Sequence, residues 1–394
     1  MSAAPRCLVV GAGRIAGGFV SPLLRSTGWE VTLVTRNALV RDLVNANERV
    51  GVRIGTDTED WVDGIRAVGV TGTEIESIAK GVDLFATSVG PSALDQAGRL
   101  LAPLVRRRLD ATNAPVNIIT FENHRQAPEL LAAGLIDADP SLAAEIGRKL
   151  GIGGAAVWRA VSNRRLEADG VWFDCDDLDE CYVDGRSLVS GAPPLGGEIP
   201  GISLVDTFEA WIVEKLWVFN AGHAAAAYLG WHAGCQTIDQ AMAIDEIRDV
   251  VAGVVGDAQI GLEVYLAAMP GGPLLPHRRP EWILGRYADP LLADSVLRVG
   301  REPRRKLSAG DRLIGPALAA MAAGHVPVSL ARAVSAALTY QPEGDRQASD
   351  LQFELELLGP EEVLAALAGL DATDELTRLI AERYAIDSTQ RICP

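Results

Sequence analysis

The chain has few cysteines, and their arrangement excludes two kinds of stabilised scaffold. Its 394 residues include five cysteines with scattered spacing and no CxxC pair. An odd, dispersed set argues against a disulfide framework and against a structural zinc site, and it is typical of a reducing compartment. We therefore expect a cytoplasmic protein without a bound metal. The cysteines are Cys7, Cys175, Cys181, Cys235 and Cys393.

The sequence also lacks net positive charge and long apolar runs. Its formal net charge is −16 at pH 7, which argues against nucleic acid or an anionic membrane as the main partner. No uninterrupted run reaches about 18 apolar residues, so we expect no membrane span. An anionic substrate would need a local basic patch that opposes the overall charge.

Glycine, by contrast, is abundant, and the chain is long enough for two domains. It has 40 glycines and only 5% aromatic residues, as in α/β proteins with many tight turns. In the first part of the chain, strand-like runs alternate with helical patterns, which predicts a parallel sheet. The apolar runs of strand length are 7–13, 30–36, 82–90 and 116–123.

The texture of the sequence changes at about residue 201, where long Ala/Leu-rich segments begin to dominate. This pattern predicts a mostly helical second domain. The acidic stretch 169–185 lies between the halves, and we expect it to be a solvated hairpin or connecting segment. We therefore predict a domain over residues 1–200 that carries the parallel sheet, and a helical domain over 201–394.

The first strand leads into a glycine-rich turn with the spacing GxGxxA. A second match, "GIGGAA" at 151–156, follows a helix-like segment, whereas the first has a strand before it and a helix after it. That context is typical of a Rossmann-type dinucleotide site, in which the backbone approaches a pyrophosphate over the helix N-terminus. The alternative is an ordinary βα turn. The predicted cofactor-binding residues here are Gly11, Gly13, Arg14, Ile15 and Ala16.

The end of the second strand indicates which dinucleotide is bound. NAD enzymes usually place Asp or Glu there to accept hydrogen bonds from the ribose 2′-OH, but this chain has Thr35, Arg36 and Asn37. Without a carboxylate, a 2′-phosphate is not repelled, and Arg36 can hold it with two N–H donors. We predict NADP(H). The alternative is that Arg36 is a plain surface charge and that NAD(H) is used.

Two further turns follow strands of the same predicted sheet. Because ligands bind at the carboxyl ends of parallel strands, these turns are expected to contact the cofactor. Glu122 and Asn123 are candidates for contact with the nicotinamide or its ribose, whereas His124 is expected to be a loop residue. The predicted cofactor contacts are Ser88, Val89, Gly90, Glu122 and Asn123.

The segment "KLWVFNAGHAAAAYLG" places three polar side chains in an apolar helix. On an α-helix, Lys215, Asn220 and His223 fall within an arc of ~140°, so they can line one side of a cleft. A buried lysine is costly unless it has a function, and in a dehydrogenase it can take the hydroxyl proton as hydride leaves. The amide and imidazole could orient the substrate oxygen. The alternative is a snorkelling lysine, a capping asparagine and a core histidine.

This helix resembles the K-x4-N-x2-H helix of the polyol-specific long-chain dehydrogenases, the family of mannitol dehydrogenase and mannitol-1-phosphate 5-dehydrogenase. The resemblance extends nearly end to end, through "GAGRIAGGF", "TSVGP", "NIITFENH", "ECYVDG" and "RVGREPRRKLSAGDRLIGP". It implies that Lys215 is the general base, that Asn220 and His223 assist, and that no metal takes part. It also implies that Arg298 and Lys306 contact substrate hydroxyls or a phosphate.

Two features depart from that family. Where the family has a segment close to P-N-S-A-V-D-R, this chain has "GGAAVWR", so Gly154 and Trp158 replace polar residues while Arg159 remains. We take Trp158 and Arg159 as candidate substrate contacts, and the replaced residues leave open a substrate other than mannitol 1-phosphate. The missing carboxylate at the second strand departs from the family's frequent use of NAD. Charge alone adds Arg301, Arg304 and Arg305 as candidates, or the segment is a solvated basic turn.

The sequence therefore predicts an NADP(H)-dependent oxidoreductase that interconverts a polyol, or polyol phosphate, and its ketose. Mannitol 1-phosphate and fructose 6-phosphate are the default pair. The alternatives are a reductase of another hydroxy or oxo compound on the same scaffold, and a non-catalytic NADPH-binding sensor. The expected partner is a small molecule, and the chain is a monomer or a homodimer.

Overall fold

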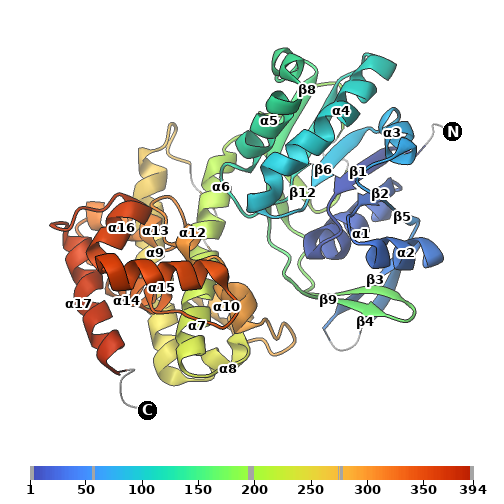
Figure 1. Ribbon diagram of the computed structural model, residues 1–394. Helices are drawn as coiled ribbons and strands as arrows, with labels where there is room; N and C mark the ends of the chain where they lie inside the picture. The colour runs from blue at the N-terminus through green and yellow to red at the C-terminus, as the bar shows by residue number, and fades with distance from the viewer. Residues whose placement is uncertain (1–3, 56–57, 194–198, 274, 276–277, 391–394) are drawn as a thin grey trace. The chain divides into compact units, whose positions relative to one another are not determined.

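The computed structural model describes residues 4–55, 58–193, 199–273, 275 and 278–390 (Figure 1). The chain divides into two compact units, Met1–Ile212 and Val213–Pro394. This division falls inside helix α6 (Phe208–Glu214), a little later than the change of sequence texture at residue 201. The first unit is α/β and the second is helical, so the predicted fold class is confirmed.

The main sheet of the first unit is built largely from parallel strands. Its strands are β1 (Arg6–Val10), β2 (Glu30–Val34), β5 (Ile65–Val68), β6 (Leu84–Thr87), β7 (Val116–Thr120), β8 (Leu150–Val157), β11 (Cys181–Asp184) and β12 (Ile202–Val205). Among the described residues they lie in the order β12-β11-β8-β7-β6-β1-β2-β5. Six neighbouring strands are mutually parallel: β5, β2, β1, β6, β7 and β8. Strand β11 runs antiparallel to β8. From β1 the chain adds strands toward β5, and it then adds β6, β7 and β8 on the other side of β1. In such sheets ligands bind at this change of direction, between β1 and β6.

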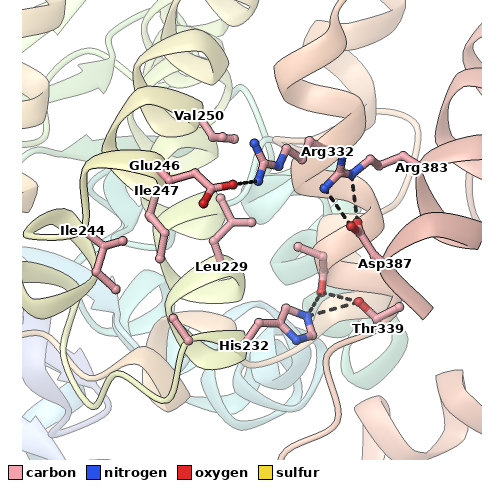
Figure 2. Close-up of a pocket in the computed structure, with 12 residues that line it drawn as sticks. Leu229, His232, Ile244, Glu246, Ile247, Val250, Arg332, Thr339, Arg383 and Asp387 are labelled. Carbon is pink, nitrogen blue, oxygen red and sulfur yellow. Dashed lines mark hydrogen bonds and ion pairs between the residues drawn. The ribbon is translucent and has the colours of Figure 1, made fainter. Parts of the chain in front are cut away.

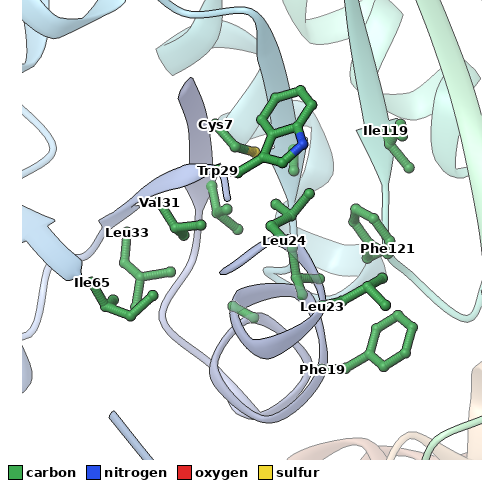
Figure 3. Packing of buried hydrophobic residues seen from close by; sticks show 14 of the residues in the cluster. Cys7, Phe19, Leu23, Leu24, Trp29, Val31, Leu33, Ile65, Ile119 and Phe121 are labelled. Carbon is green, nitrogen blue, oxygen red and sulfur yellow. The ribbon is translucent and has the colours of Figure 1, made fainter. Parts of the chain in front are cut away.

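Helices cover both faces of this sheet, which explains why its strands are apolar throughout. Leu8 and Val10 belong to one buried cluster, whereas Cys7 and Val9 belong to the other, because successive side chains alternate across a strand (Figure 3). The helical elements are η1 (Ala16–Val20), α1 (Ser21–Ser26), α2 (Ala38–Asn47), α3 (Thr73–Ala79), η2 (Pro91–Ala93), α4 (Leu94–Thr112), α5 (Ala127–Ala138) and η3 (Pro140–Ala144).

A smaller sheet corrects the prediction for the acidic stretch 169–185. Its strands are β3 (Arg49–Ile54), β4 (Thr58–Asp63), β9 (Val161–Glu167) and β10 (Gly170–Cys175), in the order β4-β3-β10-β9. Strand β10 is almost wholly buried, and β11 from the same stretch joins the main sheet, so the stretch is not a solvated connector. Its acidic groups have partners: Asp174 pairs with Arg165, and Asp176 accepts from the backbone of Ala160.

The second unit is helical among its described residues. Its elements are η4 (Lys215–Phe219), α7 (Asn220–His232), α8 (Ile238–Met242), α9 (Asp245–Ala268), α10 (Pro280–Tyr287), α11 (Val296–Gly300), α12 (Pro303–Lys306), α13 (Ile314–Ala322), α14 (Val328–Leu338), α15 (Arg346–Leu358), α16 (Pro360–Ala368) and α17 (Glu375–Gln390). Helix α9 packs against α7, α13 and α14 and forms the centre of the unit.

Within the described part of the chain, α9 is the one helix long and apolar enough to cross a membrane. Half of its most apolar stretch is buried inside the protein. It also carries Asp257, whose carboxylate accepts from the N–H groups of Ser329 and Leu330 at 3.0 and 3.1 Å and contacts His325 at 2.7 Å. The carboxylate holds the N-terminus of α14, so α9 is a core helix of this unit.

Candidate active site

Four neighbouring strands of the main sheet end in one row. Their register pairs Val34 with Val10, Val10 with Thr87, and Thr87 with Thr120. The predicted cofactor-binding residues follow directly after these ends. The structure therefore brings the glycine turn and the turns after β2, β6 and β7 to one edge of the sheet, as the sequence predicted.

The glycine turn is wedged against the turn after β6. Gly11 has φ +108°, and its N–H donates to the carbonyl of Val34 at 2.9 Å. A Cβ atom at this position would lie 2.2 Å from the carbonyl oxygen of Ser88. Only glycine combines this backbone conformation with so close an approach.

Gly13 lies in a different environment. A Cβ atom there would meet nothing closer than the carbonyl oxygen of Ser88 at 3.6 Å, an ordinary contact. Packing inside the protein therefore does not require glycine at this position, whereas a ligand that approaches the backbone would. Ala16 is fully buried at the start of η1, and Ile15 is partly buried before it.

An arginine from the smaller sheet contacts the glycine turn, and sequence reasoning missed it. Arg164 on β9 donates to the carbonyl of Ala12 at 3.0 Å. The predicted residue Arg14 reaches back to the carbonyl of Ser162 at 3.4 Å. These contacts join β9 to the turn, and no local spacing in the sequence would have indicated them.

Glu122 is buried behind the turn after β6. It is 4% exposed, and its two oxygens accept from the hydroxyl of Thr87 and the N–H of Val89, each at 2.9 Å. Burial raises the pKa of Glu122 to about 7, although these hydrogen bonds act in the opposite direction. Its carboxyl group therefore holds the 87–90 turn in place. Gly90 has φ +89° with open space around it, and Asn123 is exposed.

The residues after β2 divide into a structural and an exposed part. The side chain of Asn37 accepts from the N–H of Val40 at 3.1 Å and so caps α2. Thr35 is partly exposed, and its hydroxyl accepts from the N–H of Asn37. Arg36 is exposed, and the described part of the chain offers it no carboxylate within ion-pair distance.

The three polar residues lie where a continuous helical run widens into a π-turn, η4, which directly follows α6 and directly precedes α7. The backbone N–H of Asn220 donates to the carbonyl of Lys215, five residues earlier rather than the four of an α-helix. Such a bond places residues i and i+5 one above the other, so Lys215 and Asn220 share a face more closely than α-helical geometry predicts. Single π-turns occur frequently at functional sites.

The side chains on this helix are buried. Lys215 is 5% exposed and Asn220 is 7% exposed. The amide nitrogen of Asn220 finds no hydrogen-bond partner among the described residues. Since buried amides are nearly always paired, an oxygen atom from a bound molecule is the expected partner.

His223 is held between an aromatic ring and a carboxylate. Its ring stacks on that of Tyr287, with centroids 5.3 Å apart and an interplanar angle of 5°. Its Nε2 lies 3.5 Å from a carboxylate oxygen of Asp294. Burial, together with the charges of Arg298 and neighbouring cations, lowers the pKa of His223 well below its usual range. The imidazole is therefore neutral near pH 7 and can donate from one nitrogen and accept at the other.

The basic segment that includes Arg298 and Lys306 is largely neutralised from within the chain. Arg298 is bonded to both oxygens of Asp294. The amine of Lys306 is 4% exposed and donates to the carbonyls of Val299, at 2.6 Å, and Arg301. Burial lowers the pKa of Lys306 well below its usual range.

The neighbouring arginines are also paired. Arg305 binds Glu302 and Asp311, each at 3.0 Å, and Arg304 binds Glu354. Arg312 and Arg305 outweigh burial and lower the pKa of Asp311 to about 2. Asp294 and Tyr287 were missed by sequence reasoning; the four-residue step from Asp294 to Arg298 was the only local signal for either.

The residues of "GGAAVWR" lie in the first unit, on β8 and the turn after it. A Cβ atom on Gly154 would lie 2.5 Å from the ring of Phe208, so the ring fills the space that a side chain would need. Trp158 is 3% exposed. Arg159 donates to the carbonyls of Leu178 and Gly18 and thereby joins this turn to η1. The competing match "GIGGAA" is part of the buried strand β8 and so forms no turn between a strand and a helix.

A cavity of about 360 Å³ in the second unit contains none of the predicted site residues (Figure 2). It lies between α7, α9, α14 and α17, with ion pairs Arg332–Glu246 and Arg383–Asp387 at its edges. His232 faces it, and on α7 that side chain points roughly 180° away from His223. The described residues also contain no cluster of three or more side chains suited to a metal ion.

Comparison with known families covers nearly the whole chain. Residues 5–197 match the profile of the mannitol dehydrogenase Rossmann domain, and residues 207–387 match that of the mannitol dehydrogenase C-terminal domain. The two matched segments correspond to the α/β part and the helical part of the chain.

Solved structures with the same fold include a Pseudomonas fluorescens mannitol 2-dehydrogenase, in a ternary complex with NAD and D-mannitol. That structure has a TM-score of 0.80 and 13% identity, over 98% of this chain and 92% of the other. A D-sorbitol dehydrogenase in substrate-free form has a TM-score of 0.72 and 14% identity, over 98% and 94%. A 2-dehydropantoate 2-reductase from Geobacter metallireducens has a TM-score of 0.54 and 16% identity, over 84% and 98%.

Proposed function

The chain belongs to the mannitol dehydrogenase family, and from this we propose that it is an NADP(H)-dependent enzyme that interconverts a polyol, or polyol phosphate, with its ketose. The family consists of dinucleotide-dependent oxidoreductases that act on CH–OH groups. The specific parts of the proposal are the cofactor, the substrate class and the proton carrier.

The observation that carries the proposal is the polar face formed by the π-turn at Lys215 and the first turn of α7. The buried amine of Lys215 shares this face with the amide of Asn220, whose nitrogen finds no partner among the described residues, and a neutral imidazole follows one turn later. Bound NADP⁺ supplies the hydride acceptor. Lys215 takes the hydroxyl proton of the alcohol as the carbon loses hydride, so the products are ketose, NADPH and one proton. Asn220 and His223 orient the substrate oxygen and stabilise its developing charge.

Gly13 supports a dinucleotide at the glycine turn. Within the described residues, a Cβ atom at position 13 would clash with nothing, whereas a Cβ atom at Gly11 would clash with the backbone of Ser88. The exposed guanidinium of Arg36, which has no carboxylate within ion-pair distance among the described residues, supports NADP(H) over NAD(H). A carboxylate at that position would accept from a ribose 2′-OH but repel a 2′-phosphate.

A substrate panel followed by NADPH absorbance tests the proposal. We expect turnover with at least one polyol or ketose, and a higher kcat/KM with NADP(H) than with NAD(H). Binding of NADPH without turnover on any member of the panel would contradict it.

A second candidate is an unphosphorylated or non-sugar hydroxy substrate. The specific observation is that Arg298, Arg304 and Arg305 are already paired with carboxylates, which weakens their attraction for a phosphate. The ring of Phe208 also fills the space beside Gly154. Comparing kcat/KM for mannitol and mannitol 1-phosphate separates the candidates, because a phosphate-binding site should favour the second by about 10-fold or more.

A further inference from the structure

Tyr287, at the end of α10, makes a hydrogen bond to the backbone of the helix that carries the polar face. Its hydroxyl donates to the carbonyl of Phe219, the last residue of the π-turn. Phe219 also precedes the first residue of α7, so the hydroxyl binds the helix where the π-turn gives way to α-helical bonds.

The ring of Tyr287 is placed as specifically as its hydroxyl. It is 3% exposed, stacks on His223, and lies 5.2 Å from the ring of Phe219. Gly222 makes this approach possible, because a Cβ atom there would lie 2.9 Å from the hydroxyl oxygen and 3.0 Å from the ring. One side chain thus contacts the backbone of the turn and the imidazole that follows it.

We propose that Tyr287 is a positioning residue, whose hydroxyl holds the helix in the wide geometry that aligns Lys215, Asn220 and His223. The inference rests on the proposed function of these three residues. It goes beyond packing, since a phenylalanine would fill the same space and stack on the same imidazole. A buried hydroxyl is costly unless it is hydrogen-bonded, and this one donates to a backbone carbonyl of the helix that it positions.

A widened turn needs such a contact. The π-turn forms an i→i+5 bond at Lys215, and the helix then returns to α-helical bonds through Phe219 and His223. A side chain that bonds to the backbone at this transition favours the wide form over the regular one. Without the hydroxyl, the turn that includes Phe219 and His223 can open more often, and the side chains before the transition can rotate relative to those after it.

The experiment is Tyr287→Phe in the full chain, with Tyr340→Phe as the matched control. Tyr340 is a fully buried tyrosine of the same unit whose hydroxyl also donates to a backbone carbonyl, that of Leu297. We expect Tyr287→Phe to lower kcat about 10- to 100-fold with little change in the KM for NADPH, because small misplacement of reacting groups has effects of this size. Amide hydrogen exchange at His223 should become at least about 10-fold faster, and it should not change in Tyr340→Phe.

Lys215→Met separates failure of this inference from failure of the proposed function. If Lys215→Met turns over normally, the proposed function is wrong, yet faster exchange at His223 in Tyr287→Phe would still support the positioning contact. If Lys215→Met is inactive while Tyr287→Phe keeps both its kcat and its exchange rate at His223, the positioning inference is overturned. An equal loss of kcat in both tyrosine variants would also overturn it, since the effect would then be general.

Discussion

The edge of the main sheet and the polar face at the start of α7 are built by opposite means. The sheet edge presents backbone groups, two glycines and an exposed arginine, and its one buried acid, Glu122, supports a turn. The helix face presents side chains that are wholly or largely buried, and partners distant in sequence hold His223, namely Asp294 and Tyr287. A site made of backbone tolerates most side-chain changes except at glycine, whereas a site made of buried side chains depends on every partner.

The largest effect should come from the buried amine. Lys215→Met keeps the length and apolar stem of the side chain but removes the group that accepts the proton. We expect kcat to fall about 10²- to 10⁴-fold, the usual range for losing a general base, with NADPH affinity unchanged. Steady-state kinetics and NADPH titration measure both quantities. A variant with kcat within a few-fold of the parent would mean that the proton leaves by another route.

Substituting alanine for each glycine of the turn should have different effects, on stability at Gly11 and on cofactor binding at Gly13. Gly11→Ala forces a methyl group against the carbonyl of Ser88 at φ +108°, so we expect the free energy of unfolding to fall by about 3 kcal/mol or more. Gly13→Ala meets no clash, so unfolding should change by less than about 1 kcal/mol, while the Kd for NADPH rises at least about 10-fold. Denaturation and cofactor titration of both variants test this. If Gly13→Ala binds NADPH normally, the open space at Gly13 is not a cofactor site.

Glu122 should make the first unit more stable in mild acid than in base. Its pKa is about 7 when folded and 4.5 for an ordinary glutamate, so the folded state holds the proton more tightly. This stabilisation is complete below about pH 4.5 and is lost as the pH rises through 7, a change of roughly 3 kcal/mol. Glu122→Gln mimics the protonated form, because its amide oxygen can accept from the N–H of Val89 while its amide nitrogen donates to the hydroxyl oxygen of Thr87. Its unfolding free energy should exceed that of the parent at pH 8 and match it near pH 4.5, and equal curves at both pH values would contradict the assignment.

The smallest effect is expected at the exposed arginine. Arg36→Ala should weaken NADP(H) binding about 10-fold, near 1.4 kcal/mol, while NAD(H) binding stays within about two-fold, because only the 2′-phosphate uses the guanidinium. Titration with both cofactors gives the ratio. An equal loss of affinity for NADP(H) and NAD(H) would mean that Arg36 does not contact the 2′-phosphate.

The sequence was most informative where function depends on local spacing. Gly11, Gly13 and the strand before them could be predicted because turn geometry limits which residues fit within a few positions. The polar face of Lys215, Asn220 and His223 could be recognised for the same reason, although its π-turn could not. That turn depends in part on Tyr287, which is remote in the chain, and no periodicity indicates such a contact.

The sequence was least informative about partners of charged groups. The arginines around Arg298 suggested a positive patch, but Asp294, Glu302, Asp311 and Glu354 neutralise much of it. The acidic stretch 169–185 suggested a solvated segment, yet Asp174 and Asp176 have partners and the apolar residues of the stretch are buried in two sheets. The net charge of a short segment reflects only its composition. Whether its side chains are buried depends on the residues that they contact in the folded protein.

Both helical segments that carry the proposed chemistry contain a wide turn, η1 after the glycine motif and η4 at Lys215. Each contains one residue more than a regular helix needs over the same span. A chain shortened by one residue in either place would have a more regular and intrinsically better helix, but its reactive groups would be out of register. Selection for thermostability alone would therefore act against catalysis at these two points.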